Sequence, residues 1–205
     1  MELAAGSDIV LEVLYPTPRR AVKTVADLQS VLSGLKDGDY VVFESVAILH
    51  YLDLKYPQPP IFGRSPEESA VIMRVIGEFQ AYTEAHILGI CRTLLPGEGA
   101  PSAEPPLDSD QLTDAMHVVA REARTIEQRV SRFDWIVGED YSAVDMAIFP
   151  FIQLLRRALL RPRASDLARR FLPLEANYPA LGRWLQRIEA LPGYDRTFPP
   201  HWRGT

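Results

Sequence analysis

The sequence predicts a two-domain protein of the α+β/all-α class. A small mixed domain (residues 1–57) is joined by a linker (58–64) to an all-helical domain (65–205). Strand and helix patterns alternate up to Pro57, and a proline-rich segment, PQPPIFGR, follows. Every later periodic segment repeats its apolar residues at helical spacing. Such a change of pattern along a chain is typical of two separately packed units.

The composition excludes several classes of function. The chain has 205 residues, is 47% hydrophobic and carries a net charge of −5, which argues against binding nucleic acid. A basic segment, LLRRALLRPRASDLARR, alternates with leucines and predicts a solvated helix face. The lone Cys91, the missing signal-peptide pattern and the lack of a long apolar run predict a cytoplasmic protein without a membrane segment. The four histidines are far apart in sequence, so no metal site is expected.

The small domain is predicted to have the order β-α-β-β-α. DIVLEVLY predicts a strand, and VKTVADLQSVL predicts a helix. Asp37–Gly38 between two short apolar runs predicts a β-hairpin. A helix from about Val46 to Lys55 then ends at Tyr56–Pro57. Its apolar residues are predicted to pack on the sheet: Val46, Ile48, Leu49 and Leu52.

The all-helical domain is predicted to begin with a capping box, SPEE, at Ser65–Glu68. One long helix follows, and then a loop, PGEGAPSAEPP, leads to a second helix over about 109–133. Apolar residues share one face of the first helix: Val71, Ile72, Val75, Ile76, Phe79, Ile87, Ile90 and Leu94.

The segment GEDYSAVDMAIFPFIQLL carries a second helix start. Ser142 and Asp145 form a predicted capping box, and Tyr141 with Met146 occupy the positions of a hydrophobic staple. The helix behind them is apolar nearly all round, which predicts a central position, and Pro150 predicts a kink or a partner for the freed carbonyl. YPALGRWLQRIEAL predicts a last helix.

Three of these segments together resemble the glutathione S-transferase family, from about residue 35 to the end: DGDYVVFESVAILHYLDLKYP, YSAVDMAIF and YPALGRWLQRIEALPGY. The resemblance implies a shortened thioredoxin-like N-terminal domain followed by an all-helical glutathione S-transferase C-terminal domain. It also implies a homodimer, glutathione as co-substrate or ligand, and a small hydrophobic molecule as second partner.

The resemblance assigns Glu44 and Ser45 to the γ-glutamyl end of glutathione. Elementary chemistry suits them to that role, because a serine and free N–H groups at a helix N-terminus bind a carboxylate. Glu44 can pair with the adjacent α-ammonium group. The alternative is a packing role, with Ser45 as an N-cap and Glu44 as an acidic residue of the first turn.

The N-terminal half departs from the family. Only 43 residues precede the Glu–Ser pair, so one strand and one helix are missing. If the first predicted strand is the family's second strand, the catalytic residue is absent, and the distance to the hairpin favours this alignment. In the other alignment, Tyr15 or Thr17 lies near the catalytic position. Leu32 or Ser33 stands where the family has a cis-proline, so a trans peptide is expected. Whether Met1 is the true start stays open.

The shortened sheet requires its strands to pair directly or another chain to cover the exposed edge. Outside it, Tyr82 and His86 lie four residues apart on the first long helix and are candidates for a hydroxyl and a base in a pocket. Cys91 is expected to be a small core residue and His50 a surface or interface residue. The tail PPHW is equally compatible with a lid over the pocket and with a free end.

The sequence supports three functions. The first is a glutathione transferase, isomerase or lyase that stabilises the glutathione thiolate and directs it at a small hydrophobic electrophile. The second is a non-catalytic ligand-binding or protein-interaction scaffold. The third is a glutathione-independent enzyme that uses the pocket between the domains. The sequence leaves open whether the protein is an enzyme.

Overall fold

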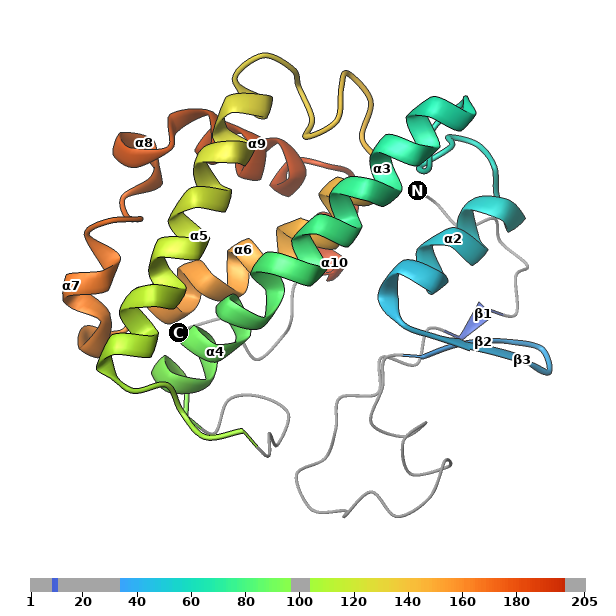
Figure 1. The fold of residues 1–205 in the computed structure, drawn as a ribbon. Helices are drawn as coiled ribbons and strands as arrows, with labels where there is room; N and C mark the ends of the chain where they lie inside the picture. The colour runs from blue at the N-terminus through green and yellow to red at the C-terminus, as the bar shows by residue number, and fades with distance from the viewer. Residues whose placement is uncertain (1–8, 11–33, 97–103, 198–205) are drawn as a thin grey trace.

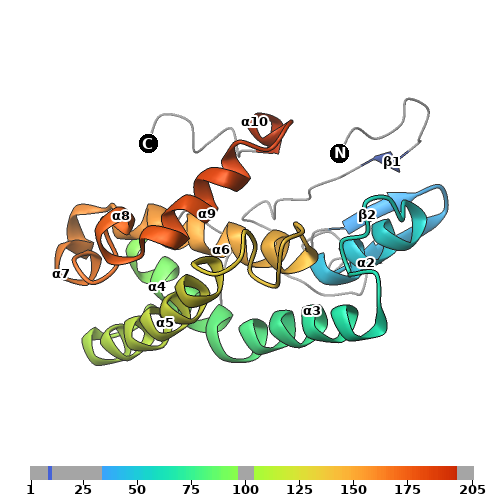
Figure 2. The ribbon, with the colours of Figure 1, turned by 90° about the horizontal axis from the view of Figure 1, so that it is seen from above.

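The computed structural model describes residues 9–10, 34–96 and 104–197. A small sheet with one helix lies beside a larger group of helices (Figure 1), and the view from above separates the same two parts (Figure 2). The predicted fold class, a mixed domain followed by an all-helical one, is confirmed. No helix among the described residues combines the length and apolar character needed to cross a membrane.

The sheet has three antiparallel strands in the order β1-β2-β3: β1 (Ile9–Val10), β2 (Gly34–Asp37) and β3 (Tyr40–Phe43). The predicted hairpin is confirmed, because β2 and β3 pair across a turn at Gly38, whose φ of +59° favours glycine. In β1, Ile9 pairs with Asp37, so the strand joins the hairpin directly.

The rest of the predicted N-terminal elements lies outside the described residues. This applies to the remainder of the strand DIVLEVLY, to the helix VKTVADLQSVL and to the tail PPHW. It also applies to four residues that the sequence singled out: Tyr15, Thr17, Leu32 and Ser33.

The helix α2 (Ser45–Lys55) begins one residue earlier than predicted. It lies between the hairpin and the helical domain, and none of its residues is fully buried. The predicted packing on the sheet therefore gives only partial burial, and Val46 and Leu49 pack against the core of the helical domain. The hydroxyl of Tyr51 and the ammonium of Lys55 both donate to Asp37 of β2. Lys55 is the main cause of a lowered pKa at Asp37.

The linker is fixed at Ile61, which is buried. Its N–H donates to the carboxylate of Asp53 in α2 at 2.6 Å, and its carbonyl accepts from the N–H of Ala143 at 2.9 Å. Ala143 begins the central helix of the helical domain. One linker residue is therefore hydrogen-bonded to both halves of the molecule.

The first predicted long helix of the helical domain is in fact three segments: α3 (Pro66–Phe79), the π-helical η1 (Gln80–Glu84) and α4 (Ala85–Leu94). Sequence periodicity missed the π-helical turn, because such a turn inserts one residue without an apolar signature. All the predicted core positions of this region are buried except Val71, which is 40% exposed. Val71 precedes Ile72 by one residue and so lies roughly 90° from the centre of the buried stripe.

The start of α3 differs slightly from the predicted capping box. Ser65 caps the helix by accepting from the N–H of Glu68 at 3.2 Å. The Glu68 carboxylate, however, accepts from the N–H of Arg64 at 2.6 Å, one residue before the cap. The serine prediction is confirmed, and the reciprocal bond is displaced by one residue.

Six further helices complete the described part of the domain. The predicted second helix ends earlier than expected, at Val130, and its N-cap is Asp108, which forms a capping box with Gln111. The short helices carry too few residues to show periodicity in the sequence. In order, the helices are α5 (Ser109–Val130), α6 (Ala143–Leu159), α7 (Ser165–Ala168), α8 (Leu174–Asn177), α9 (Pro179–Glu189) and α10 (Tyr194–Thr197). A 3-10 turn, Pro162–Ala164, precedes α7.

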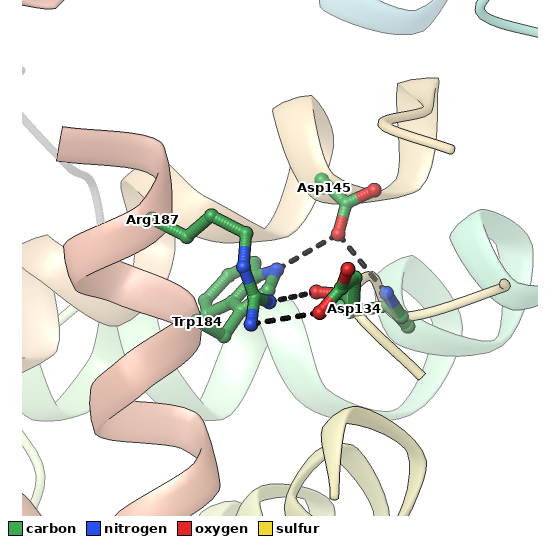
Figure 3. A network of polar contacts seen from close by, with 5 residues as sticks. Asp134, Asp145, Trp184 and Arg187 are labelled. Atoms are coloured by element: carbon green, nitrogen blue, oxygen red, sulfur yellow. Dashed lines mark hydrogen bonds and ion pairs between the residues drawn. The ribbon is translucent and has the colours of Figure 1, made fainter. Parts of the chain in front are cut away.

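The helix α6 is central, as predicted: it contacts α2, α3, α4 and α7, and Pro150 lies on its exposed side. Its predicted capping box is confirmed, since one Asp145 oxygen accepts from the N–H and the hydroxyl of Ser142, each at 3.0 Å. The other oxygen accepts from the N–H of Ile136 at 3.1 Å and from Nε1 of Trp184 at 2.8 Å (Figure 3). Burial raises the pKa of Asp145, and these hydrogen bonds oppose that effect.

Candidate ligand site at the start of α2

Glu44 has a backbone conformation that non-glycine residues rarely adopt. Its φ is +69° and its ψ is 126°, and among the described residues no other non-glycine residue has a positive φ. Such a conformation costs on the order of 1–3 kcal/mol and persists only where the surrounding structure enforces it. Strained residues of this kind cluster at ligand sites, so the strain marks Glu44 as a candidate functional residue.

The conformation of Glu44 also determines which residue caps α2. Glu44 itself is the N-cap, since its carbonyl accepts the first helical hydrogen bond, from the N–H of Ile48 at 2.9 Å. Its side chain makes no capping bond, and Ser45 is the first helical residue. The packing alternative, in which Ser45 is the N-cap, is therefore wrong. Within the described part of the chain, the first-turn N–H groups of α2 have no side-chain cap, which leaves them available to an anion.

A second carboxylate lies near this helix start. Glu84 is the last residue of η1 and is half-buried; burial raises its pKa first, and the charge of Glu44 raises it further. Two carboxylates that lie near each other form a site that favours a cation. The start of α2 thus offers N–H donors and a hydroxyl on one side and acidic groups on the other.

Sequence reasoning did not find Glu84. Its proximity to Glu44 depends on the π-helical turn and on the tertiary fold that brings η1 near the start of α2. Neither feature has a sequence signal that spacing would reveal.

The structure places the other candidate residues at separate positions. Tyr82 is 67% exposed and His86 is half-buried, both on the segment that includes η1 and α4. Cys91 is buried, as predicted, and burial raises the pKa of its thiol to about 12. His50 is exposed, with its ring edge-on to Phe62 at 5.3 Å between centroids. No group of three or more metal-binding side chains occurs among the residues that the structure describes.

Within the described part of the chain, two cavities involve the helices of the larger domain. One, of about 470 Å³, lies between the first turns of α3 and the loop before α6, and Arg64, Val71 and Tyr141 are among its lining residues. The other, of about 400 Å³, lies between α5 and the segment before α9. Neither is lined by Tyr82 or His86, so the predicted pocket for these two side chains stays a prediction.

Comparisons with known proteins agree on one family. The family model "Glutathione S-transferase, C-terminal domain" matches residues 98–192. Glutathione S-transferase F10 of Arabidopsis thaliana is 26% identical over 123 residues, which are 59% of this chain and 56% of that protein. The probable maleylacetoacetate isomerase 1 of Drosophila melanogaster is 25% identical over 179 residues, 86% of this chain and 63% of that protein.

A solved structure gives the same fold. Glutathione S-transferase-I bound with the ligand lactoylglutathione superimposes with a TM-score of 0.63 at 21% identity, covering 82% of this chain and 74% of that one. At this identity the likeness shows the fold alone: a short thioredoxin-like domain and a helical domain. The chain spans 56% and 63% of the two curated relatives, roughly three fifths of their length.

Proposed function

The chain belongs to the glutathione S-transferase family, and on that premise we propose that it binds glutathione by the γ-glutamyl end at Glu44 and Ser45. The observation that carries the proposal is the strained backbone of Glu44 at an uncapped helix start. The solved relative that holds lactoylglutathione supports a glutathione-type ligand.

The two charges of an amino-acid end suit the two sides of this site. The α-carboxylate accepts from the hydroxyl of Ser45 and from the first N–H groups of α2, where the helix dipole favours an anion. The α-ammonium group pairs with Glu44, and Glu84 adds a second negative charge nearby. A ligand with a single charge would satisfy only one side.

The proposed reaction is the use of glutathione on a small hydrophobic electrophile by a cytoplasmic homodimer. Tyr15 and Thr17, the candidates for stabilising the thiolate, lie outside the described residues, and the buried thiol of Cys91 is unsuited to that role. The exposure of Tyr82 favours a second candidate function, a glutathione-binding scaffold without chemistry.

Calorimetric titration of glutathione tests the binding proposal. We expect millimolar or tighter binding by the wild type, and at least tenfold weaker binding by Glu44→Ala/Ser45→Ala. The matched control is Glu139→Ala/Ser109→Ala, because Ser109 is also the first residue of a helix and Glu139 is an exposed acid. No heat in the wild type, or equal weakening in both variants, would remove glutathione from this site.

A turnover assay then separates catalyst from scaffold. The wild type is mixed with glutathione and an aryl halide, and the rate of thioether formation is compared with the uncatalysed rate. A rate above background that disappears in Glu44→Ala/Ser45→Ala indicates a transferase. Binding without turnover of several electrophiles indicates a scaffold.

A further inference from the structure

A polar cavity of about 400 Å³ lies on the helical domain, between α5, the segment joining α7 to α8, and the start of α9. In both ribbon views, α7 and α8 lie at the opposite end of the molecule from α2 (Figures 1 and 2). The cavity is therefore distinct from the candidate glutathione site. It is lined by Arg124, Glu127, Gln128, Arg170, Asn177 and Tyr178.

Two guanidinium groups of this cavity have no carboxylate partner. Within the described part of the chain, neither Arg124 nor Arg170 forms an ion pair, whereas the neighbouring Arg169 pairs with Asp166. The one polar contact of Arg170 is to a histidine, with its Nη1 3.4 Å from Nε2 of His117 on α5. Among the described residues, these two cations of one cavity therefore lack a direct ion-pair partner.

The one carboxylate of the cavity is already occupied. The oxygens of Glu127 accept from the N–H groups of Ala180 and Leu181, at 3.0 and 2.7 Å. These are the first N–H groups of α9, whose own N-cap makes no side-chain bond. Glu127 thus lies at the positive end of the α9 dipole, and both of its oxygens are hydrogen-bonded to the helix start instead of to the guanidinium groups.

The remaining lining residues are neutral and include hydrogen-bond donors. Tyr178 is 4% exposed, and burial raises the pKa of its phenol, so the hydroxyl stays protonated. Asn177 and Gln128 contribute side-chain amides. Guanidinium groups that line one cavity together with neutral donors suit phosphate and carboxylate oxygens, because the arginine fork matches the geometry of these groups.

We propose that this cavity binds a small organic molecule through an oxyanion group, a phosphate or a carboxylate, held between Arg124 and Arg170. The volume lies in the range of small-molecule sites, roughly 300–1,000 Å³, and so accommodates more than a bare ion. The basic segment LLRRALLRPRASDLARR, which the sequence predicted to be a solvated helix face, supplies one of the two arginines.

Calorimetric titrations with pyrophosphate and with succinate, at low ionic strength, test the proposal and distinguish a phosphate from a carboxylate site. We expect the wild type to bind at least one of them, and Arg124→Gln/Arg170→Gln to bind it at least tenfold more weakly. The matched control is Arg132→Gln/Arg163→Gln, which removes the same charge from exposed positions outside the cavity.

The proposal is overturned if the wild type binds neither probe, or if the two double variants weaken binding equally, since the effect would then be one of net charge. Thermal unfolding of each variant checks that the fold is intact, and the exposed Arg170→Gln alone replaces the double variant if it is not. The Glu44→Ala/Ser45→Ala protein is expected to keep its anion binding, which separates this site from the glutathione site.

Discussion

Replacing Asp145 by asparagine keeps the size of the side chain and removes two of its acceptor sites. The carboxylate is fully buried and accepts four hydrogen bonds, two on each oxygen. In the better orientation of the amide, its oxygen keeps the bonds from Ile136 and Trp184. Its NH₂ group then points at the N–H of Ser142, so that two donors face each other.

The expected loss in the free energy of unfolding follows from these four hydrogen bonds. The buried N–H of Ser142 loses its acceptor, at a cost of about 1–3 kcal/mol. The bonds from Ile136 and Trp184 change from charge-assisted to neutral, which roughly halves their strength. Removing a buried charge offsets part of this loss, because burial disfavours the carboxylate. The expected net loss is about 3 kcal/mol, or about 6–12 °C in Tm for a chain of this length.

Urea unfolding monitored by circular dichroism measures this loss of stability. We expect the urea concentration at the unfolding midpoint to fall. The m-value, which is the slope of the free energy of unfolding against urea concentration, is expected to stay constant, because the surface exposed on unfolding does not change. Asp140→Asn is the matched control: it lies in the same segment, but is exposed and pairs with Arg64, so its loss is expected to stay below about 1 kcal/mol. A loss below 1 kcal/mol for Asp145→Asn would refute the hydrogen-bond account of this helix start.

Two further predictions concern Glu44 and Cys91. Glu44→Gly is expected to be about 1–2 kcal/mol more stable than Glu44→Ala, since glycine adopts the positive φ without strain. Both variants are expected to lose glutathione binding. Equal thermal stability of the two variants would show that the conformation of Glu44 is not strained. The thiol of Cys91, with a pKa raised to about 12, holds a thiolate fraction of roughly 10⁻⁴ at pH 8. An aromatic disulfide reagent is therefore expected to react slowly with the native protein, faster as the pH rises and stoichiometrically in urea, whereas fast native labelling at pH 8 would contradict the burial.

Elements with local signals could be predicted from the sequence. The hairpin turn at Gly38 and the capping residues Ser65 and Ser142 depend on neighbours within a few positions, and the structure confirms them. The role of Asp145 was only half predictable. Its bonds to Ser142 are local, but the bond to Trp184 joins residues 39 positions apart and requires the packed domain.

The candidate site likewise combines residues that the sequence predicts with features that depend on the folded structure. Glu44 and Ser45 stand out in the sequence because they are adjacent polar residues before an apolar helix. The positive φ of Glu44 could not be predicted from the sequence, because glutamate rarely adopts this backbone conformation. Glu84 was missed because the π-helical turn that carries it has no periodic pattern. Similarly, Glu127 caps α9 from another helix, and nothing near α9 in the sequence indicates it.

The hydrogen bond from the N–H of Ile61 to Asp53 fixes α2 near its C-terminal end, and the helix can rotate about this fixed point. About eight residues, or roughly 12 Å of helix, separate Asp53 from Ser45 at the other end. A rotation of about 10° around the fixed point would move the Ser45 end by roughly 2 Å, enough to misalign a bound amino-acid group. A substitution such as Asp53→Ala, two turns away from any ligand, is thus expected to weaken glutathione binding through position alone.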